Sequence, residues 1–244
     1  MQVHNETTIQ SNIRIGAIKA PKSTATIGFQ NYRLPAPEFL TFSRIKYAFN
    51  AQCDLSLISL PMFGEFNTSL DVQARTTTIP LTGKTKVTSV AIQIASEVFE
   101  LRDNGKSKFN GKDATIFPIL MDYNYTIAKE EVENLVANTT ETNYVISLEG
   151  GDTITFVSIE RTIRLIVEAE NLMKEIESYG SGGMLGVPSA TKLMGRNGTS
   201  ATPAKMGTEW QVRATEQSDL LFRTVQEPQF PVECVPSTIQ SLDV

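Results

Sequence analysis

The sequence predicts an α+β protein, with a mostly antiparallel β-sheet or barrel and two helices packed on it. Strand-like alternation runs through residues 41–122, turn dipeptides separate the alternating segments, and two later segments have helical periodicity. Hydrophobic residues make up 41% of the 244 residues and charged residues 20%, which is enough to build a core. An extended N-terminal arm and a long irregular C-terminal tail are expected to flank this domain.

Shifts in composition divide the chain into three parts. Residues 1–40 are polar and interrupted by prolines, which predicts an extended arm with one short strand at Thr24–Phe29. Residues 41–179 are expected to form the α+β core domain. Residues 180–244 are rich in glycine and proline, so this tail is not expected to bury a core of its own.

The first half of the core domain has strand patterns. Apolar and polar residues alternate, at least approximately, in three segments: Arg44–Phe49, Leu55–Leu60 and Ser69–Thr78. Lys84–Ile94 begins like a strand, but its second half also fits a helical stripe. Asn104-Gly105 and Asn110-Gly111 predict hairpin turns. The apolar run Thr115–Met121 is expected to be a buried strand, and its proline places it at a sheet edge or a bulge.

The second half contains the expected helices. Thr126 is a good N-cap, and the apolar residues after it predict a helix at about 127–137. Two strands are expected next, Asn143–Leu148 and Thr153–Val157, with a hairpin turn at Glu149–Asp152 between them. Ser158 can then cap a longer helix at about 159–178, where apolar residues recur at helical spacing.

Charge and residue counts exclude several classes of function. The net charge of -5 and the pI near 5.1 argue against sequence-specific nucleic-acid binding. One histidine, His4, and two cysteines exclude a histidine-rich metal site and a zinc ribbon, and no cofactor is expected. Cys53 and Cys234 could lie together, but their distance in the sequence favours reduced, buried thiols, and the sequence leaves their redox state open. The sequence has no signal peptide and no apolar stretch of membrane-spanning length, which predicts a soluble protein of a cytosol-like compartment.

One segment ends like a phosphate-binding loop. In residues 78–85, Gly83 would help to cradle phosphates, Lys84 would contact the terminal phosphate, and Thr85 would hold Mg²⁺. Thr78 stands where the first glycine of such a loop belongs, and the alternative is a hairpin turn at Leu81–Lys84. Nucleophilic catalysis lacks a base near the core, so the protein is not expected to be an enzyme.

Large apolar residues interrupt the predicted tail. Four of them are expected to act as anchors: Trp210, Leu220, Phe222 and Phe230. They could fill grooves on a neighbouring molecule, or they could pack back on their own domain.

Together these features favour a structural subunit of a large symmetric homo-oligomeric assembly, held together by exchanged arms. The favoured case is a virus or bacteriophage virion protein (capsid, tail tube or connector), found in the virion or in the host cytoplasm during assembly. Its partners would be copies of itself and other particle proteins, without a membrane. Two alternatives stay open: a non-enzymatic adaptor whose tail folds on a partner, and a nucleotide-binding enzyme with a degenerate phosphate loop at 78–85.

Overall fold

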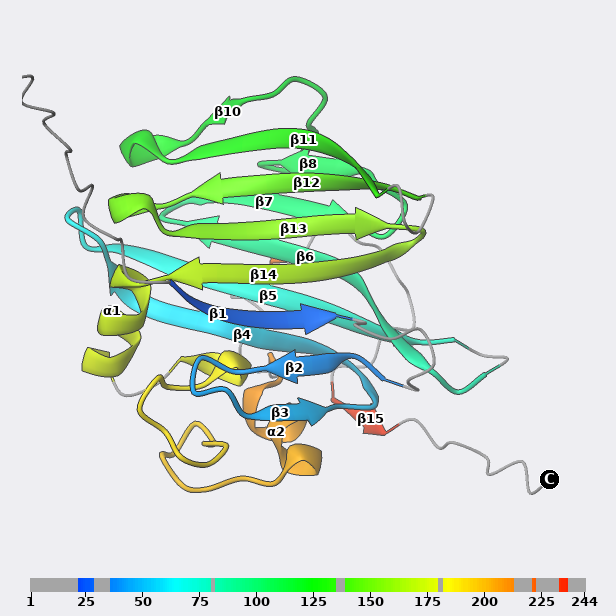
Figure 1. The fold of residues 1–244 in the computed structure, drawn as a ribbon, viewed down its shortest axis with the longest axis vertical. Helices are drawn as coiled ribbons and strands as arrows, with labels where there is room; N and C mark the ends of the chain where they lie inside the picture. The colour runs from blue at the N-terminus through cyan, green and yellow to red at the C-terminus, as the bar shows by residue number, and fades with distance from the viewer. Residues whose placement is uncertain are drawn as a thin grey trace, which may run out of the picture.

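In the computed structural model, two antiparallel β-sheets stack face to face (Figure 1). The structure describes residues 22–28, 36–79, 82–134, 139–179, 182–212, 221–222 and 233–236. Neither sheet closes on itself within these ranges. The mostly antiparallel β-rich class is therefore confirmed, and the architecture is an open sandwich and not a barrel.

Sheet A has eight strands. In spatial order they are β10 (Ile119–Leu120), β11 (Thr126–Asn134), β12 (Thr139–Ser147), β13 (Thr153–Ile159), β14 (Thr162–Ala169), β1 (Ser23–Gly28), β2 (Glu38–Leu40) and β3 (Lys46–Ala48). Strands β10 to β14 form a meander, and β1 then pairs with β14. Residues from the predicted N-terminal arm thus complete this sheet.

Sheet B has seven strands. In spatial order they are β15 (Val235–Pro236), β4 (Ala51–Phe63), β5 (Thr68–Thr78), β6 (Thr85–Ile94), β7 (Glu97–Arg102), β8 (Ser107–Phe109) and β9 (Lys112–Asp113). Strands β4 to β9 form a second meander, and the two-residue β15 pairs with the outer edge of β4.

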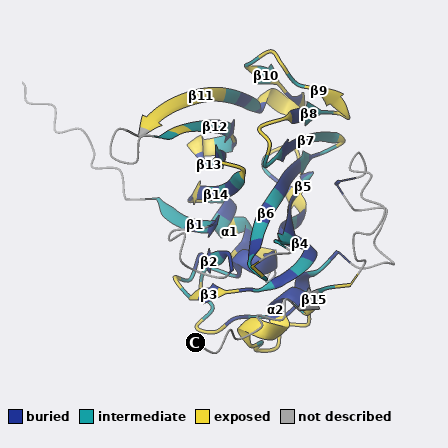
Figure 2. Cartoon of the chain, turned by 90° about the vertical axis from the view of Figure 1, so that its right-hand side faces the viewer, coloured by how far each residue is buried: buried dark blue, intermediate teal, exposed yellow. Residues whose placement is uncertain are grey.

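The core lies between the two sheets (Figure 2). The strand register aligns one inward row of sheet A, and all of its members are fully buried: Ala25, Val167, Ile154, Ile146 and Ile127. Burying one large aliphatic side chain contributes about 1.5–3 kcal/mol. The alternation of inward apolar residues is therefore the main force that holds the two sheets together.

Among the described residues, two short helices and three 3-10 turns accompany the sheets. The helix α1 (Asn171–Tyr179) begins beside Asp152, whose carboxylate accepts hydrogen bonds from the N–H groups of Glu170 and Leu172 at 2.9 and 2.8 Å. The helix α2 (Pro203–Trp210) packs against β4. The turns are η1 (Asp122–Asn124), η2 (Glu149–Gly151) and η3 (Gly183–Leu185). In the part of the chain that the structure describes, no helix is long and apolar enough to cross a membrane.

Both predicted helices need correction. The predicted helix at 127–137 is wrong, because residues 126–134 form β11 and pair with β12 along their full length, while 135–137 lie outside the described residues. In the predicted helix at 159–178, residues 162–169 form β14, and only Asn171–Tyr179 is helical. Strand pairing is a tertiary contact, so it overrides the local helical pattern.

Other local predictions are confirmed. Strand β1 corresponds to the short strand expected at Thr24–Phe29, although Phe29 itself lies outside the described residues. The ambiguous segment Lys84–Ile94 forms strand β6. Asn104-Gly105 lies in the turn between β7 and β8, and Asn110-Gly111 joins β8 to β9. Gly105, Asn110 and Gly111 have positive φ angles, as such turns require.

Candidate interaction surfaces

The outer face of sheet A, which is the side turned away from sheet B, has a row of uncharged side chains. The strand register aligns six half-buried residues across six strands, and we call them the central row: Ala128, Val145, Thr155, Ile166, Thr26 and Leu40. Figure 1 looks onto this face, and no described helix or strand crosses it.

Charged side chains lie beside the central row and at its end. Arg164 donates to Glu141 at 3.1 Å, and Lys46, on the edge strand β3, pairs with Glu38 at 2.9 Å. A sheet face that meets water is normally polar and charged along its whole width. An uncharged row of this length is instead typical of a contact surface.

Residues 114–121 cross from sheet B to sheet A over the rim of the sandwich. The strand expected at Thr115–Met121 is confirmed only for Ile119–Leu120, which forms the edge strand β10 as the proline predicted. Its expected burial is wrong, because Ile116 and Leu120 are 82% and 75% exposed. Phe117 and Ile119 pack against the core, since a crossing segment can turn only one side inward. Leu120 lies opposite Thr126, so it extends the outer face of sheet A.

The edge of sheet A beyond β10 is charged. β10 pairs only with Thr126 and Ile127, so residues 128–134 of β11 have no described strand on their outer side. This stretch contains Lys129, Glu130, Glu131 and Glu133, and Figure 2 shows much of it as exposed. Charges on an open edge oppose strand addition by another molecule. Association with another molecule through the outer face of sheet A is therefore favoured over strand addition at the β11 edge.

Two partly exposed aromatic rings lie against each other, tilted by 36°, at the end of the sandwich where α1 begins. Phe66 lies in the turn between β4 and β5, and Tyr123 lies in η1. Their ring centroids are 5.0 Å apart, and the residues are 51% and 43% exposed. We call them the aromatic pair. The two rings bring a turn of sheet B into contact with a turn of sheet A.

Three glutamates accept backbone hydrogen bonds from the turns that carry the aromatic pair. They are Glu175 with the N–H of Gly64 (3.2 Å), Glu149 with the N–H of Glu65 (2.9 Å) and Glu97 with the N–H of Asp122 (2.5 Å). Glu149 also accepts a hydrogen bond from the Tyr125 hydroxyl at 2.9 Å. Burial, and then the hydrogen bond to Glu149, raises the pKa of Tyr125, so this hydroxyl remains a donor.

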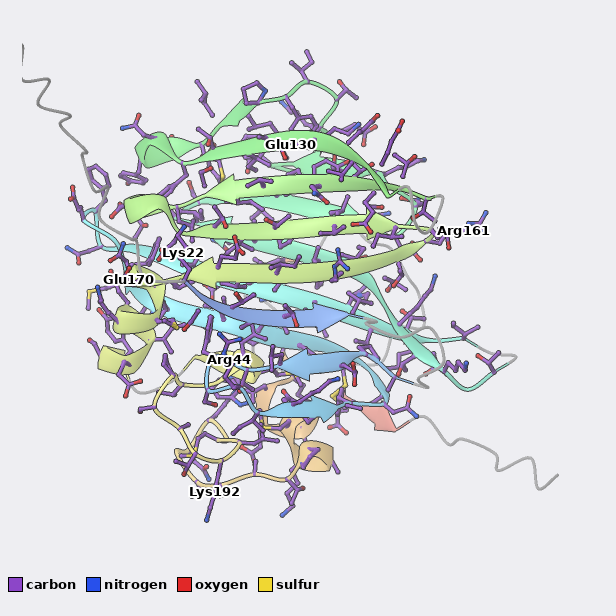
Figure 3. The ribbon with its side chains drawn as sticks, viewed as in Figure 1. Lys22, Arg44, Glu130, Arg161, Glu170 and Lys192 are labelled. Carbon is purple, nitrogen blue, oxygen red and sulfur yellow. A yellow bond between two sulfur atoms is a disulfide. The ribbon has the colours of Figure 1, made fainter. Side chains whose placement is uncertain are left out.

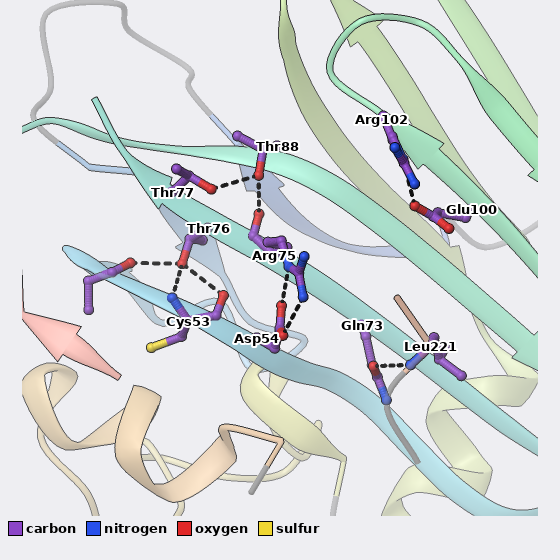
Figure 4. Close-up of polar contacts among 11 residues, drawn as sticks. Cys53, Asp54, Gln73, Arg75, Thr76, Thr77, Thr88, Glu100, Arg102 and Leu221 are labelled. Atoms are coloured by element: carbon purple, nitrogen blue, oxygen red, sulfur yellow. Dashed lines mark hydrogen bonds and ion pairs between the residues drawn. The ribbon is translucent and has the colours of Figure 1, made fainter. Parts of the chain in front are cut away.

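The outer face of sheet B has a buried polar network (Figure 4). Arg75 donates to both carboxylate oxygens of Asp54 at 2.7 and 2.8 Å, and the two side chains are only 3% and 9% exposed. The Leu221 N–H donates to Gln73 at 3.0 Å, and the Arg75 guanidinium lies 5.1 Å from the ring of Phe222. Residues 221–222 therefore cover this part of sheet B, in contrast to the uncovered central row on sheet A.

A groove of about 270 Å³ opens beside β4. Its described lining residues are Ser56, Ser59, Pro61, Arg196 and Trp210. Ser59 donates to Asp71 at 2.6 Å, and Arg196 donates to the carbonyl of Gln211 at 2.8 Å. Since these polar groups are bonded within the protein, the groove offers little that would select a ligand.

The phosphate-loop candidates Gly83, Lys84 and Thr85 lie in the hairpin between β5 and β6. The N–H of Ile79 donates to the Lys84 carbonyl at 2.7 Å, and the Thr85 hydroxyl donates to Asn50 at 2.6 Å. A phosphate-binding loop needs a helix after the threonine, and here the strand β6 follows. Among the described residues, no three His, Cys, Asp or Glu side chains are grouped so that they could hold a metal ion.

Two of the four predicted anchors fall within the described residues, and both pack on their own chain. Trp210 and Phe222 are 6% and 1% exposed. The indole N–H of Trp210 donates to the Met194 carbonyl at 2.9 Å, and Phe222 packs beside Ala91. Leu220 and Phe230 lie outside the described residues.

Cys53 and Cys234 form a disulfide, so the prediction of reduced thiols is wrong. Their Cα atoms are 4.7 Å apart, although 181 residues separate the two cysteines in the sequence. The Cys234 N–H donates to Gln211 at 2.8 Å, and β15 follows directly. Disulfides are rare in a reducing cytosol, so this bond does not fit the cytosol-like compartment expected from the sequence.

Comparison with known proteins identifies no relative: no protein-family model and no curated protein matches the chain.

Proposed function

We propose that this protein is a non-catalytic structural subunit that self-associates into a symmetric assembly through the outer face of sheet A. The central row carries the proposal, because six uncharged, half-buried side chains lie in register with no described element over them. Exposed Leu120 extends this surface at the rim. The uncharged central row can pack against the same row of a second copy around a two-fold axis, so a second copy is the natural occupant.

The size of the face supports a specific contact. Six strands spaced about 4.8 Å apart are about 24 Å wide. At about 3.4 Å per residue, seven residues of β11 to β14 give a similar length, whereas β1 has six residues and β2 only three, so the product is an upper limit. The product is close to about 600 Å², which approaches the roughly 800 Å² per partner of a standard interface. Two sheets that pack in this way lie about 10 Å apart, with side chains of the two faces interdigitating.

A lysine placed in the central row tests this proposal. Ile166→Lys would bury two charges in a two-fold interface, and we expect the association constant to fall by about 100-fold or more. The matched control is Gln93→Lys, at a half-exposed strand position of sheet B. Size-exclusion chromatography with light scattering measures the mass, and circular dichroism checks that both variants are folded. If Ile166→Lys assembles like the wild type, the outer face of sheet A is not the interface.

The narrower proposal of a virion protein is supported by the sequence argument alone. The adaptor alternative predicts a monomer in dilute solution, so the mass of the wild type separates it from self-assembly. The nucleotide-binding alternative has lost its main support, because a strand follows Thr85.

A further inference from the structure

We propose that the aromatic pair, Phe66 and Tyr123, binds a basic peptide segment, and that this segment is residues 10–21 of a second copy of the chain. The inference rests on the proposed function, since it assigns a second contact within the same assembly. A two-fold contact through the central row joins only two copies, so a larger assembly needs a second kind of contact.

The aromatic pair is a preorganised platform. A single exposed aromatic residue is ordinary, but two rings that contact each other from two separate turns need both turns to be fixed. Hydrogen bonds to Glu149 and Glu175 fix the turn that carries Phe66, and a hydrogen bond to Glu97 fixes the turn that carries Tyr123. Because the two turns are already ordered, binding of a side chain to the aromatic pair costs little free energy for ordering them.

The charges around the pair favour a cationic occupant. Five carboxylates lie on or against its two turns: Glu65, Glu97, Asp122, Glu149 and Glu175. None of the ion pairs found among the described residues involves any of these five. A guanidinium or ammonium group over an aromatic ring, with carboxylates around it, gains both cation–π and charge-assisted stabilisation.

The chain itself contains a segment with the required charge. Residues 10–22 include Arg14, Lys19 and Lys22 and no acidic residue, in a protein with a net charge of -5. Lys22 donates a hydrogen bond to the carbonyl of Gly151 in η2, and Figure 3 places it near Glu170, where α1 begins. Lys22, the first described residue after this segment, thus lies at the end of the sandwich that carries the aromatic pair.

This position permits reciprocal exchange. Lys19 can lie up to about 10 Å from Lys22 along an extended chain, and Arg14 up to about 28 Å. Two copies that meet at this end around a two-fold axis could each place these residues on the partner's aromatic pair.

Zero-length crosslinking of mixed isotopic copies tests the inference on the full chain. Heavy and light protein are mixed, treated with a carbodiimide that joins amines to carboxylates, digested and analysed by mass spectrometry. We expect heavy–light links from Lys19 to Glu65 or Asp122. The double variant Phe66→Ala with Tyr123→Ala should lower their yield by about five-fold or more, and its exposed positions leave the core intact. The control Lys19→Arg keeps the charge and removes the reactive amine, so links from this position should vanish.

The outcomes separate the possible occupants. Links found only within one isotopic form would show that the segment binds its own copy, and the second-copy assignment would be wrong. Absence of links, or links that persist at full yield in the double alanine variant, would refute the binding role of the aromatic pair. A negative crosslinking result does not bear on the proposed function. If the wild type assembles and Ile166→Lys does not, the proposed function holds even when the crosslinks refute the role of the aromatic pair.

Discussion

Loss of the Asp54 carboxylate should destabilise the protein strongly. In the wild type the Arg75 side chain is 3% exposed and donates two charge-assisted hydrogen bonds to Asp54, at 2.7 and 2.8 Å. The variant Asp54→Ala removes both of these hydrogen bonds while the guanidinium remains buried. Breaking one side of a buried ion pair costs about 3–5 kcal/mol. A typical domain is stable by only about 5–15 kcal/mol, so this one change removes a large share of the free energy of unfolding.

Equilibrium unfolding in urea measures this loss. Trp210 is the only tryptophan and is buried, so its fluorescence reports on the folded state. With a slope of about 1–3 kcal/mol per molar urea, the midpoint should fall by about 1–3 M. The matched control Glu141→Ala removes the partner of Arg164 in an ion pair whose side chains are 16% and 32% exposed, and should cost less than about 1 kcal/mol.

A double variant tests whether the loss of stability comes from the unpaired buried charge. Asp54→Leu combined with Arg75→Met replaces the pair by apolar side chains and should recover most of the lost stability, because no charge is left buried. The reasoning is refuted if Asp54→Ala costs no more than Glu141→Ala, since the pair would then behave like one at the surface.

Three further predictions concern the framework around these surfaces. Cys53→Ser removes a crosslink that spans 181 residues and should lower the free energy of unfolding by about 3–5 kcal/mol, and equal melting temperatures with and without reductant would contradict this. Tyr125→Phe removes a donor to Glu149 and should cost about 1 kcal/mol. Because folding raises the pKa of Tyr125, the wild type should lose stability as the pH rises above about 10, the ordinary value, and urea titrations from pH 8 upward should give the variant a smaller loss. Gly207→Ala would place a Cβ 1.9 Å from the ring of Phe49, so a loss of about 2 kcal/mol or more is expected, and an unchanged urea midpoint would argue against this packing of α2.

Sequence patterns predict strands well where one face is apolar and the other is polar. Thr153–Val157 alternates in this way, and the structure has it as part of β13. Glycine- and asparagine-containing turns were predictable for the same local reason, because positive φ angles restrict the residues that can occupy them. Such features depend only on neighbouring residues.

The helix predicted at 159–178 fails for a reason that bears on function. In β14, Ile163, Leu165 and Val167 point into the core, while Ile166 points outward in the central row. With apolar residues on both faces, the strand loses its alternation, and helical spacing fits equally well. The outward Ile166 that misleads the secondary-structure prediction belongs to the central row that supports the proposed self-association.

Contacts between distant segments were not predictable. The disulfide depends on β15 reaching β4, and the aromatic pair depends on two turns of different sheets meeting at one end. Neither arrangement has a local signal in the sequence. The apolar character of Thr115–Met121 was visible, but its exposure follows from its position at the rim between the sheets.

Sedimentation of the wild-type protein over a range of concentrations is the most direct measurement of self-association. Self-association predicts species heavier than the 26.9 kDa chain, with a weight-average mass that rises with concentration. Introducing Ile166→Lys should return the mass to that of a single chain. A single 26.9 kDa species of the wild type at every concentration would contradict the account.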